Sequence, residues 1–162
     1  MINEEIIINN AIKWSRSYLG SKEYALKCLG FIQDAIEKSN DIEIVGGYSA
    51  KESADFYNVY ENIGLPPKGA FIFYNCECLI DDELMNLGHC GLSLGNGEVI
   101  HSWDVIRIDN YLDVENLNEN FILGNPKYIG WAPIERVLIG YQYKSIEDNK
   151  SIIWIKDNIE SS

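Results

Sequence analysis

The sequence predicts an α+β fold in which helices come first and an antiparallel β-sheet follows. Apolar residues recur at helical spacing in the first third of the chain. Residues 66–69, Pro-Pro-Lys-Gly, then force a turn, and short apolar runs and alternating residues beyond them indicate strands. Helices followed by a run of strands are typical of α+β domains. The length of 162 residues is that of one domain, so we expect a single domain over residues 1–162.

Three helices are expected before that turn. Residues 4–18 carry apolar side chains on one helical face, and residues 28–38 repeat the pattern. Cys28 is therefore the first residue of the second helix. Ser49, with Glu52 three residues later, matches a capping box, which predicts that a third helix starts there.

Strands are expected after the turn. Residues 70–74 form a short apolar run that suits a buried strand, whereas the polar and acidic residues 75–87 indicate a surface loop. Residues 90–94 and 99–103 flank Gly-Asn-Gly-Glu, which is a strong hairpin signal. Further strands are expected at residues 105–108, 128–131, 139–143 and 151–155.

The acidic composition argues against two classes of partner. The chain has 13 Lys and Arg against 25 Asp and Glu, a formal net charge of −12. Nucleic acids and anionic membranes attract basic patches, so we expect neither as a partner. No apolar run approaches the ~18 residues of a membrane span. The first nine residues lack the basic and apolar regions of a signal peptide, which favours the cytoplasm or export by another route.

Four cysteines, Cys28, Cys76, Cys78 and Cys90, are expected to be reduced thiols in a protein without a signal peptide. The single residue between Cys76 and Cys78 is a poor spacing for a disulfide and differs from the two-residue gap of zinc knuckles. A metal site made of Cys76, Cys78 and His89 is a minor alternative to small apolar side chains in or beside a strand. We therefore expect no metal and no cofactor.

The only two histidines of the chain, His89 and His101, both lie in the expected hairpin. Cys28 opens a helix, where exposed backbone N–H groups and the helix dipole favour a thiolate. A thiolate, a histidine base and a third polar group that steers the base are the minimum set for acyl transfer. Each residue alone could belong to the core, but the combination favours catalysis.

Three segments of the sequence resemble NlpC-type cell-wall peptidases. Residues 28–33, Cys-Leu-Gly-Phe-Ile-Gln, are similar to the Cys-Ser-Gly-Phe-Val-Gln start of that family's nucleophile helix. Residues 67–73 resemble its Pro-Gly-Asp-Leu-Val-Phe-Phe strand. Residues 88–101 resemble its His-Val-Gly-Ile-Tyr-Leu-Gly-Asn-Gly-Lys-Met-Ile-His block, with the same separation between the two histidines. The likeness covers roughly residues 10–133 and leaves 134–162 as a C-terminal extension.

The resemblance implies a papain-like core, with N-terminal helices packed on an antiparallel sheet. It implies that Cys28 attacks a peptide carbonyl, that His89 is the base, and that His101 orients the ring of His89. The implied activity is hydrolysis of amide bonds in the stem peptides of peptidoglycan, so that a peptide or a peptidoglycan fragment is the substrate. The family needs no metal.

The resemblance also points to residues that would contact the substrate. The family usually has Asp before the cysteine and Ser after it, where this chain has Lys27 and Leu29. A lysine repels an amine and a leucine offers no hydrogen bond, so we expect stems with a free N-terminal amine to be disfavoured. Tyr24 or Tyr18 is a candidate for the family's tyrosine upstream of the cysteine. Trp103, which follows the hairpin, is a further aromatic candidate for a substrate contact, with Tyr24.

The register of the hairpin decides whether its two histidines can act together. With a plain two-residue turn, His101 faces Leu92, and His89 then lies on the opposite side of the sheet because side chains alternate. With one extra residue His101 faces Gly91, which puts both histidines on one face. We therefore predict an odd register, through a three-residue loop or an equivalent bulge, with Cys28 approaching the same face.

Two other functions compete with the peptidase. A CHAP-type amidase is one alternative, but that family usually orients its histidine with Asn or a carboxylate, and His101 argues against it. A catalytically silent, peptidase-like binding module is the other. The replacement of two polar positions by Lys27 and Leu29, together with the acidic surface, favours that alternative.

Overall fold

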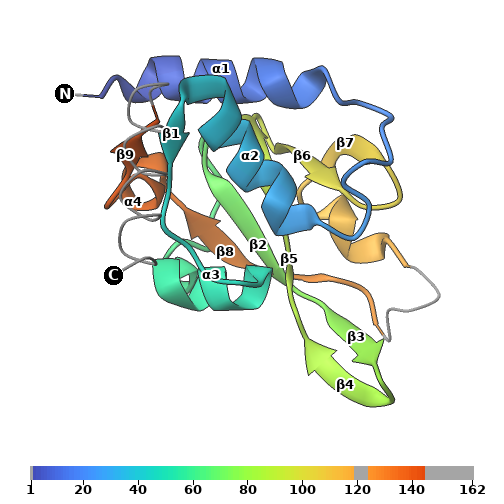
Figure 1. Ribbon diagram of the computed structural model, residues 1–162. Coiled ribbons are helices and arrows are strands. Elements are labelled where there is room, and N and C mark those ends of the chain that lie inside the picture. The colour runs from blue at the N-terminus through green and yellow to red at the C-terminus, as the bar shows by residue number, and fades with distance from the viewer. Residues whose placement is uncertain (1, 119–123, 145–162) are drawn as a thin grey trace, which may run out of the picture.

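The computed structural model describes residues 2–118 and 124–144, and over these ranges the chain has the predicted α+β fold (Figure 1). A five-stranded antiparallel sheet with the strand order β7-β6-β5-β2-β8 forms its centre. Its strands are β2 (Phe71–Asn75), β5 (His89–Gly95), β6 (Glu98–Ser102), β7 (Ile106–Asn110) and β8 (Lys127–Ala132).

The first two helices hold the position of Cys28. α1 (Glu4–Arg16) packs against α2 (Cys28–Asn40), and α2 lies on the sheet over β5 and β6 (Figure 1). The apolar face of α2 makes this contact, with Phe31, Ile32 and Ile36 fully buried. Complete burial of an apolar side chain of this size is worth about 1.5–3 kcal/mol. The helix that begins with Cys28 is therefore firmly anchored in the core.

The third helix, α3 (Ala50–Tyr57), begins at its predicted cap. The Ser49 side chain accepts a hydrogen bond from the backbone N–H of Glu52 at 3.1 Å, as the capping pattern predicts. The helix ends at Asn58, which adopts a left-handed conformation, and a short 3₁₀ turn η1 (Val59–Glu61) follows. None of the described helices is long and apolar enough to span a membrane.

Both faces of strand β2, which lies between β5 and β8, are buried, which explains its continuous apolar run. Phe71 and Phe73 belong to the main core, beneath the helices. Ile72 and Tyr74 point to the other face, where they meet Val114 of the short 3₁₀ turn η2 (Asp113–Asn116).

The loop that was expected at residues 75–87 is instead a β-hairpin, and this expectation is wrong. β3 (Glu77–Ile80) pairs with β4 (Glu83–Asn86), and Asp81 and Asp82 form a two-residue turn in which both have positive φ. This β3–β4 hairpin projects from the body of the protein (Figure 1). Most of its side chains are exposed, so the sequence lacks the apolar alternation that would have revealed the strands.

The strand expected at residues 139–143 is also largely wrong. The chain forms a short helix α4 (Ile134–Val137), and only β9 (Gln142–Tyr143) is a strand, paired with β1 (Ile42–Glu43). Tyr141 packs against the main core while Ile139 is exposed, so their alternation does not arise from a sheet. The strand expected at residues 151–155 lies outside the described residues.

Candidate active site

The β5–β6 hairpin has the predicted odd register. Leu92 faces Ile100, whereas Gly95 faces Glu98, so one extra residue bulges out of β5. His101 therefore lies opposite Gly91. A Cβ atom on Gly91 would stand 2.9 Å from the Cβ of His101, closer than real contacts allow. The predicted odd register is therefore confirmed. It arises from a bulge in β5 and not from a three-residue loop.

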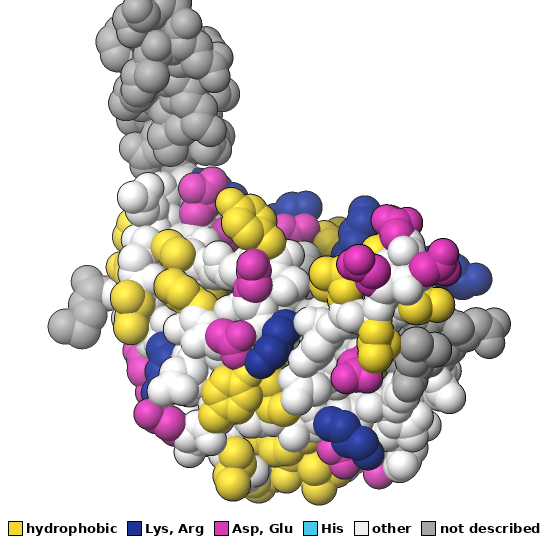
Figure 2. Space-filling model, turned by 90° about the horizontal axis from the view of Figure 1, so that it is seen from below, with side chains coloured by type: hydrophobic (Ala, Val, Ile, Leu, Met, Phe, Trp, Pro, Cys, Tyr) yellow, Lys and Arg dark blue, Asp and Glu magenta, His cyan; other side chains and the backbone are white. Residues whose placement is uncertain are grey.

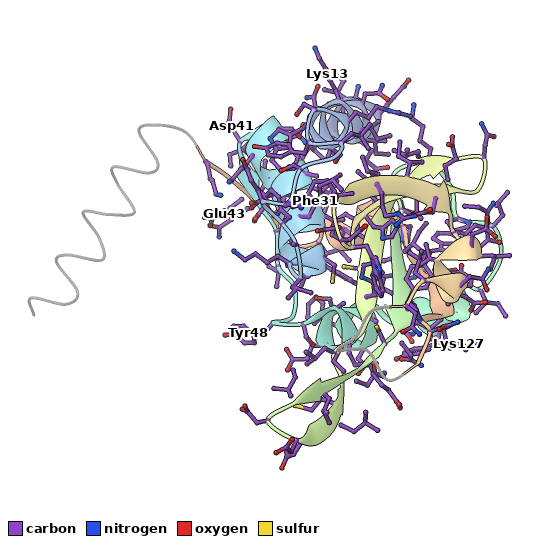
Figure 3. All side chains as sticks on the ribbon, turned by 90° about the vertical axis from the view of Figure 1, so that its right-hand side faces the viewer. Lys13, Phe31, Asp41, Glu43, Tyr48 and Lys127 are labelled. Atoms are coloured by element: carbon purple, nitrogen blue, oxygen red, sulfur yellow. The ribbon has the colours of Figure 1, made fainter. Side chains whose placement is uncertain are left out.

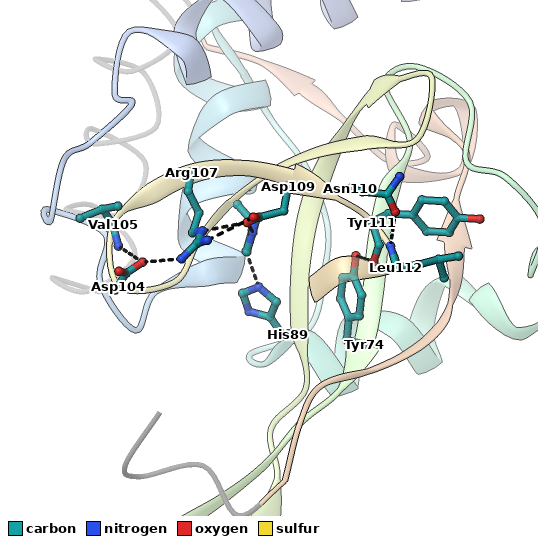
Figure 4. A network of polar contacts seen from close by, with 10 residues as sticks. Tyr74, His89, Asp104, Val105, Arg107, Asp109, Asn110, Tyr111 and Leu112 are labelled. Carbon is teal, nitrogen blue, oxygen red and sulfur yellow. Dashed lines mark hydrogen bonds and ion pairs between the residues drawn. The ribbon is translucent and has the colours of Figure 1, made fainter. Parts of the chain in front are cut away.

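This register brings the two histidines together. His89 Nε2 lies 2.8 Å from His101 Nδ1, and both rings are almost completely buried. His101 Nε2 lies in turn 2.7 Å from a carboxylate oxygen of Asp109 on the neighbouring strand β7 (Figure 4). Asp109 is a site residue that the sequence interpretation did not identify.

A salt bridge fixes Asp109. Arg107 donates from Nε to Asp109 Oδ2 at 2.8 Å and from a terminal nitrogen to Oδ1 at 3.2 Å (Figure 4). Such two-point contacts orient a carboxylate strongly. Hydrogen bonds from His101 and Arg107 lower the pKa of Asp109 below its ordinary value. The carboxylate is therefore ionised and accepts hydrogen bonds only.

An ionised Asp109 determines the protons of both histidines. Burial lowers the pKa of His101 to about 4, so this ring is neutral near neutral pH. Its single proton is on Nε2, which donates to Asp109, and its Nδ1 accepts. His89 must then donate from Nε2 to His101. Nδ1 of His89 is therefore the nitrogen that can exchange a proton with a nucleophile.

Cys28 completes the site at the first turn of α2. Hydrogen bonds from Cys90 and His89 lower the pKa of its thiol well below the ordinary value, against the opposing effect of burial. Burial raises the pKa of Cys90, which remains a thiol that donates to Cys28. Lys27, at the N-cap of α2, gives no side-chain cap, so amides of the first turn remain available to an anion.

We call Cys28, His89, His101 and Asp109 the Cys28 row. The sequence predicted three of its members, and the structure brings them together. Asp109 was missed because the strand expected at residues 105–108 ended before it. In the structure β7 runs from Ile106 to Asn110 and includes Asp109. The alternation of Arg107 and Asp109 opposite β6 was the only available signal.

A cleft of about 970 Å³ lies over Cys28 and His89. Three of the four predicted substrate contacts, Lys27, Leu29 and Trp103, line it, and the Trp103 ring stacks edge-on against His89 with centroids 5.0 Å apart.

The fourth predicted contact, Tyr24, does not line the cleft. Its hydroxyl donates to Asp34 at 2.6 Å, and its ring packs among Trp14, Tyr18 and Phe31. Tyr24 therefore does not occupy the predicted substrate position. It belongs to an aromatic cluster with residues of α1 and α2.

The outer wall of the cleft was not predicted from the sequence. It is formed by Cys78, Leu79 and Ile80 of the β3–β4 hairpin, a segment that was expected to be a surface loop. On the other side Tyr48 projects outward, between α2 and the hairpin (Figure 3).

The other thiols of the cleft differ in character from Cys28. Burial raises the pKa of Cys76 to about 12 and also raises that of Cys78, so both remain protonated near neutral pH. All four cysteines are free. The alternative metal site of Cys76, Cys78 and His89 has no structural counterpart within residues 2–118 and 124–144, where no three metal-binding side chains are suitably placed.

No protein-family model and no curated protein sequence matches this chain. The chemistry of the site is therefore inferred from its own geometry. A thiol with a lowered pKa stands beside an imidazole whose second nitrogen is fixed by another imidazole and a carboxylate. Such an arrangement can take a proton from the thiol and return it to a leaving group.

Proposed function

We propose that the protein is a cysteine hydrolase that cleaves amide bonds through a thioester on Cys28. One observation carries this proposal: the Cys28 row runs from a helix start, through two buried imidazoles, to an ionised carboxylate. A structural role explains the burial of each member. It does not explain why, of the three thiols that line the cleft, Cys28 alone has a lowered pKa.

In the proposed reaction the Cys28 thiolate attacks the carbonyl carbon of the substrate. The oxygen of the tetrahedral intermediate accepts hydrogen bonds from backbone amides at the start of α2. His89 gives the proton that it took from Cys28 to the departing amine, and the C–N bond breaks. Water then attacks the thioester with His89 as base, which releases the carboxylic acid and restores Cys28.

His101 and Asp109 act through His89. While His89 carries the extra proton, its Nε2–H donates to the neutral His101, and the Asp109 carboxylate stabilises the charge through His101. Arg107 keeps Asp109 ionised on a strand that is part of the sheet. The sheet thus preorganises the base before a substrate binds.

The resemblance to NlpC-type peptidases supports peptidoglycan stem peptides as the first substrates to test. A nucleophile helix packed on the hairpin that carries the base fits a papain-like core. Lys27 and Leu29 both line the cleft, which supports the expectation that acetylated stems are preferred to stems with a free amine. The same two residues favour the silent binding module as the second candidate function.

Site-resolved alkylation decides between the two functions. We expect iodoacetamide to label Cys28 selectively, with a midpoint well below the ordinary thiol value of about 8.5. His89→Ala should raise that midpoint, and Cys78→Ala, which removes another thiol of the cleft, should leave it unchanged. A Cys28 midpoint at or above about 8.5 would reject the hydrolase and leave the binding module.

The substrate class is tested by digestion of purified cell wall, with mass spectrometry of the released peptides. We expect the wild type to release peptides and Cys28→Ala to release none. A matched pair of stem peptides, one with a free amine and one acetylated, then tests the expectation from Lys27 and Leu29.

A further inference from the structure

The strand β3 presents its edge to the cleft, and not only one of its faces. Cys78, Leu79 and Ile80 are successive residues, and all three line the cleft. Side chains of a strand alternate between its two faces, so a single face would contribute only every second residue. The lining includes no residue of the partner strand β4 (Glu83–Asn86). β3 therefore lies between β4 and the cleft.

The backbone groups of Leu79 point away from β4. Ile80 and Glu83 flank the two-residue turn, so they form the first hydrogen-bonded pair of the hairpin, and Leu79 and Leu84 form the next pair, which is not hydrogen-bonded. Within residues 2–118 and 124–144, β3 pairs with no strand other than β4, and no turn or loop backbone bonds to Leu79. An N–H and a C=O are therefore presented at the outer edge of β3.

This edge lacks the usual protection against pairing with another chain. Natural edge strands are often blunted by Pro, by Lys or by a bulge. β3 contains neither Pro nor Lys, and its register with β4 is regular over all its residues. Figure 2 shows the face from which the hairpin projects, with hydrophobic side chains among acidic and basic ones. An open and regular edge of this kind suits an added peptide strand.

β3 begins beside the proposed catalytic base. Gly88, which precedes His89, donates its backbone N–H to the carbonyl of Cys76, the residue before β3, at 3.3 Å. An extended chain advances about 3.3 Å per residue, so Leu79 lies roughly 10 Å along the strand from Cys76. A peptide that runs from the reacting bond along β3 reaches Leu79 with about its third residue.

We infer that the substrate is an extended peptide that adds a strand to the free edge of β3. Leu79 N–H donates to a carbonyl of this peptide, and Leu79 C=O accepts from one of its N–H groups. The inference rests on the proposed hydrolase and adds how its substrate is held. The backbone of Leu79 then selects peptides with at least three residues on one side of the cleaved bond.

Two pairs of alkylating peptides test this selection without a turnover assay. One pair is iodoacetyl-alanine amide and iodoacetyl-tetraalanine amide, which extend on the amine side of Cys28. The other pair is the chloromethyl ketones of acetyl-alanine and acetyl-tetraalanine, which extend on the acyl side. Two hydrogen bonds are worth about tenfold in affinity. We expect the longer peptide to label Cys28 about tenfold faster in one of the two pairs, as measured by mass spectrometry.

Methylation of the peptide nitrogens distinguishes strand pairing from a general gain with length. In a strand, successive N–H groups point in opposite directions, so only every second one faces β3. In the pair that shows the gain, an N-methyl group at one of the two middle alanines should abolish it. An N-methyl group at the other should leave most of it.

Leu79→Pro tests the protein side of the same contact. Proline has no backbone N–H and is tolerated at strand edges where that N–H is unpaired. We expect the gain to fall at least threefold. Leu84→Pro is the matched control, because Leu84 is the cross-strand partner of Leu79 and its N–H points to the opposite edge, away from the cleft. The rate with iodoacetamide should be unchanged in both variants, which shows that each has folded.

The outcomes separate the inference from the function beneath it. Equal rates for short and long peptides in both pairs, or equal effects of the two N-methyl groups, would overturn pairing with β3 and leave the hydrolase intact. A gain that survives Leu79→Pro as well as Leu84→Pro would do the same. Slow labelling of Cys28 by every reagent, iodoacetamide included, would overturn the proposed function itself.

Discussion

At the scale of single residues, Asp109 is a positioning residue whose replacement should reduce catalysis while the fold is retained. Asp109→Asn removes the charge that stabilises the protonated His89 through His101. We expect kcat to fall on the order of a hundredfold. This loss is smaller than the ~10⁴-fold known for a carboxylate that contacts the base directly. The measurement is kcat and KM on any amide that the wild type cleaves, with KM nearly unchanged.

Asp104→Asn provides the matched control for that experiment. Asp104 also pairs with Arg107, at 3.3 Å, but it does not contact either histidine. A purely structural role for Asp109 predicts similar small effects from both substitutions. A positioning role predicts in addition that only Asp109→Asn raises the pH midpoint of Cys28 alkylation. Equal midpoints in the two variants would remove Asp109 from the Cys28 row.

At the scale of elements, the β5–β6 hairpin depends on a residue without a side chain. In Gly91→Ala the new Cβ would stand 2.4 Å from a methyl group of Val99 and 2.9 Å from the Cβ of His101. Relief requires movement of β6, so we expect a loss of about 1–3 kcal/mol in the free energy of unfolding. Urea denaturation measures that loss, and Cys28 alkylation should slow because His89 loses its partner.

Gly64→Ala is the control for the hairpin, since a Cβ there meets nothing within 4 Å. Its free energy of unfolding should stay within about 0.5 kcal/mol of the wild type. If Gly91→Ala lowered the free energy of unfolding no more than Gly64→Ala does, β5 and β6 would accept a wider spacing than the close contacts of Gly91 with Val99 and His101 allow.

The same hairpin shows what could be predicted from the sequence. Strict alternation of side chains in a strand fixed the faces of His89 and His101, so a single assumption, one extra residue, was enough to predict their contact. The core helices were predictable because their apolar periodicity reflects burial. Asp109 was not, because one acidic residue on a polar edge strand resembles any solvated carboxylate. The β3–β4 hairpin was missed because a two-stranded ribbon without a buried face leaves no apolar alternation.

At the scale of the whole molecule, His101 makes stability depend on pH. Its pKa is about 4 in the folded protein and about 6.5 in the unfolded chain, so between these values the unfolded chain binds more protons. This contribution is fully present above about pH 6.5 and is lost as the pH falls towards 4. We expect a loss of about 3 kcal/mol over this window, measured by urea denaturation.

Two other groups whose pKa is shifted are removed from the comparison. Burial raises the pKa of Glu37, which acts in the opposite direction, and the lowered pKa of Cys28 acts in the same direction. The reference protein therefore carries Glu37→Gln and Cys28→Ser, and its His101→Gln version is the test. A slope between pH 4 and 6.5 that survives in the test protein would show that His101 is not its source.

The β3–β4 hairpin should have a lower local stability than the five-stranded sheet. Segments with few buried apolar contacts open locally at a small fraction of the global unfolding cost, whereas core strands exchange their amide hydrogens only on global unfolding. Amides of Glu77–Asn86 should therefore exchange with solvent orders of magnitude faster than those of β2 and β5. The hairpin wall of the cleft can thus open locally while the Cys28 row keeps its geometry. A bulky substrate could then enter and leave without any transient melting of the catalytic sheet.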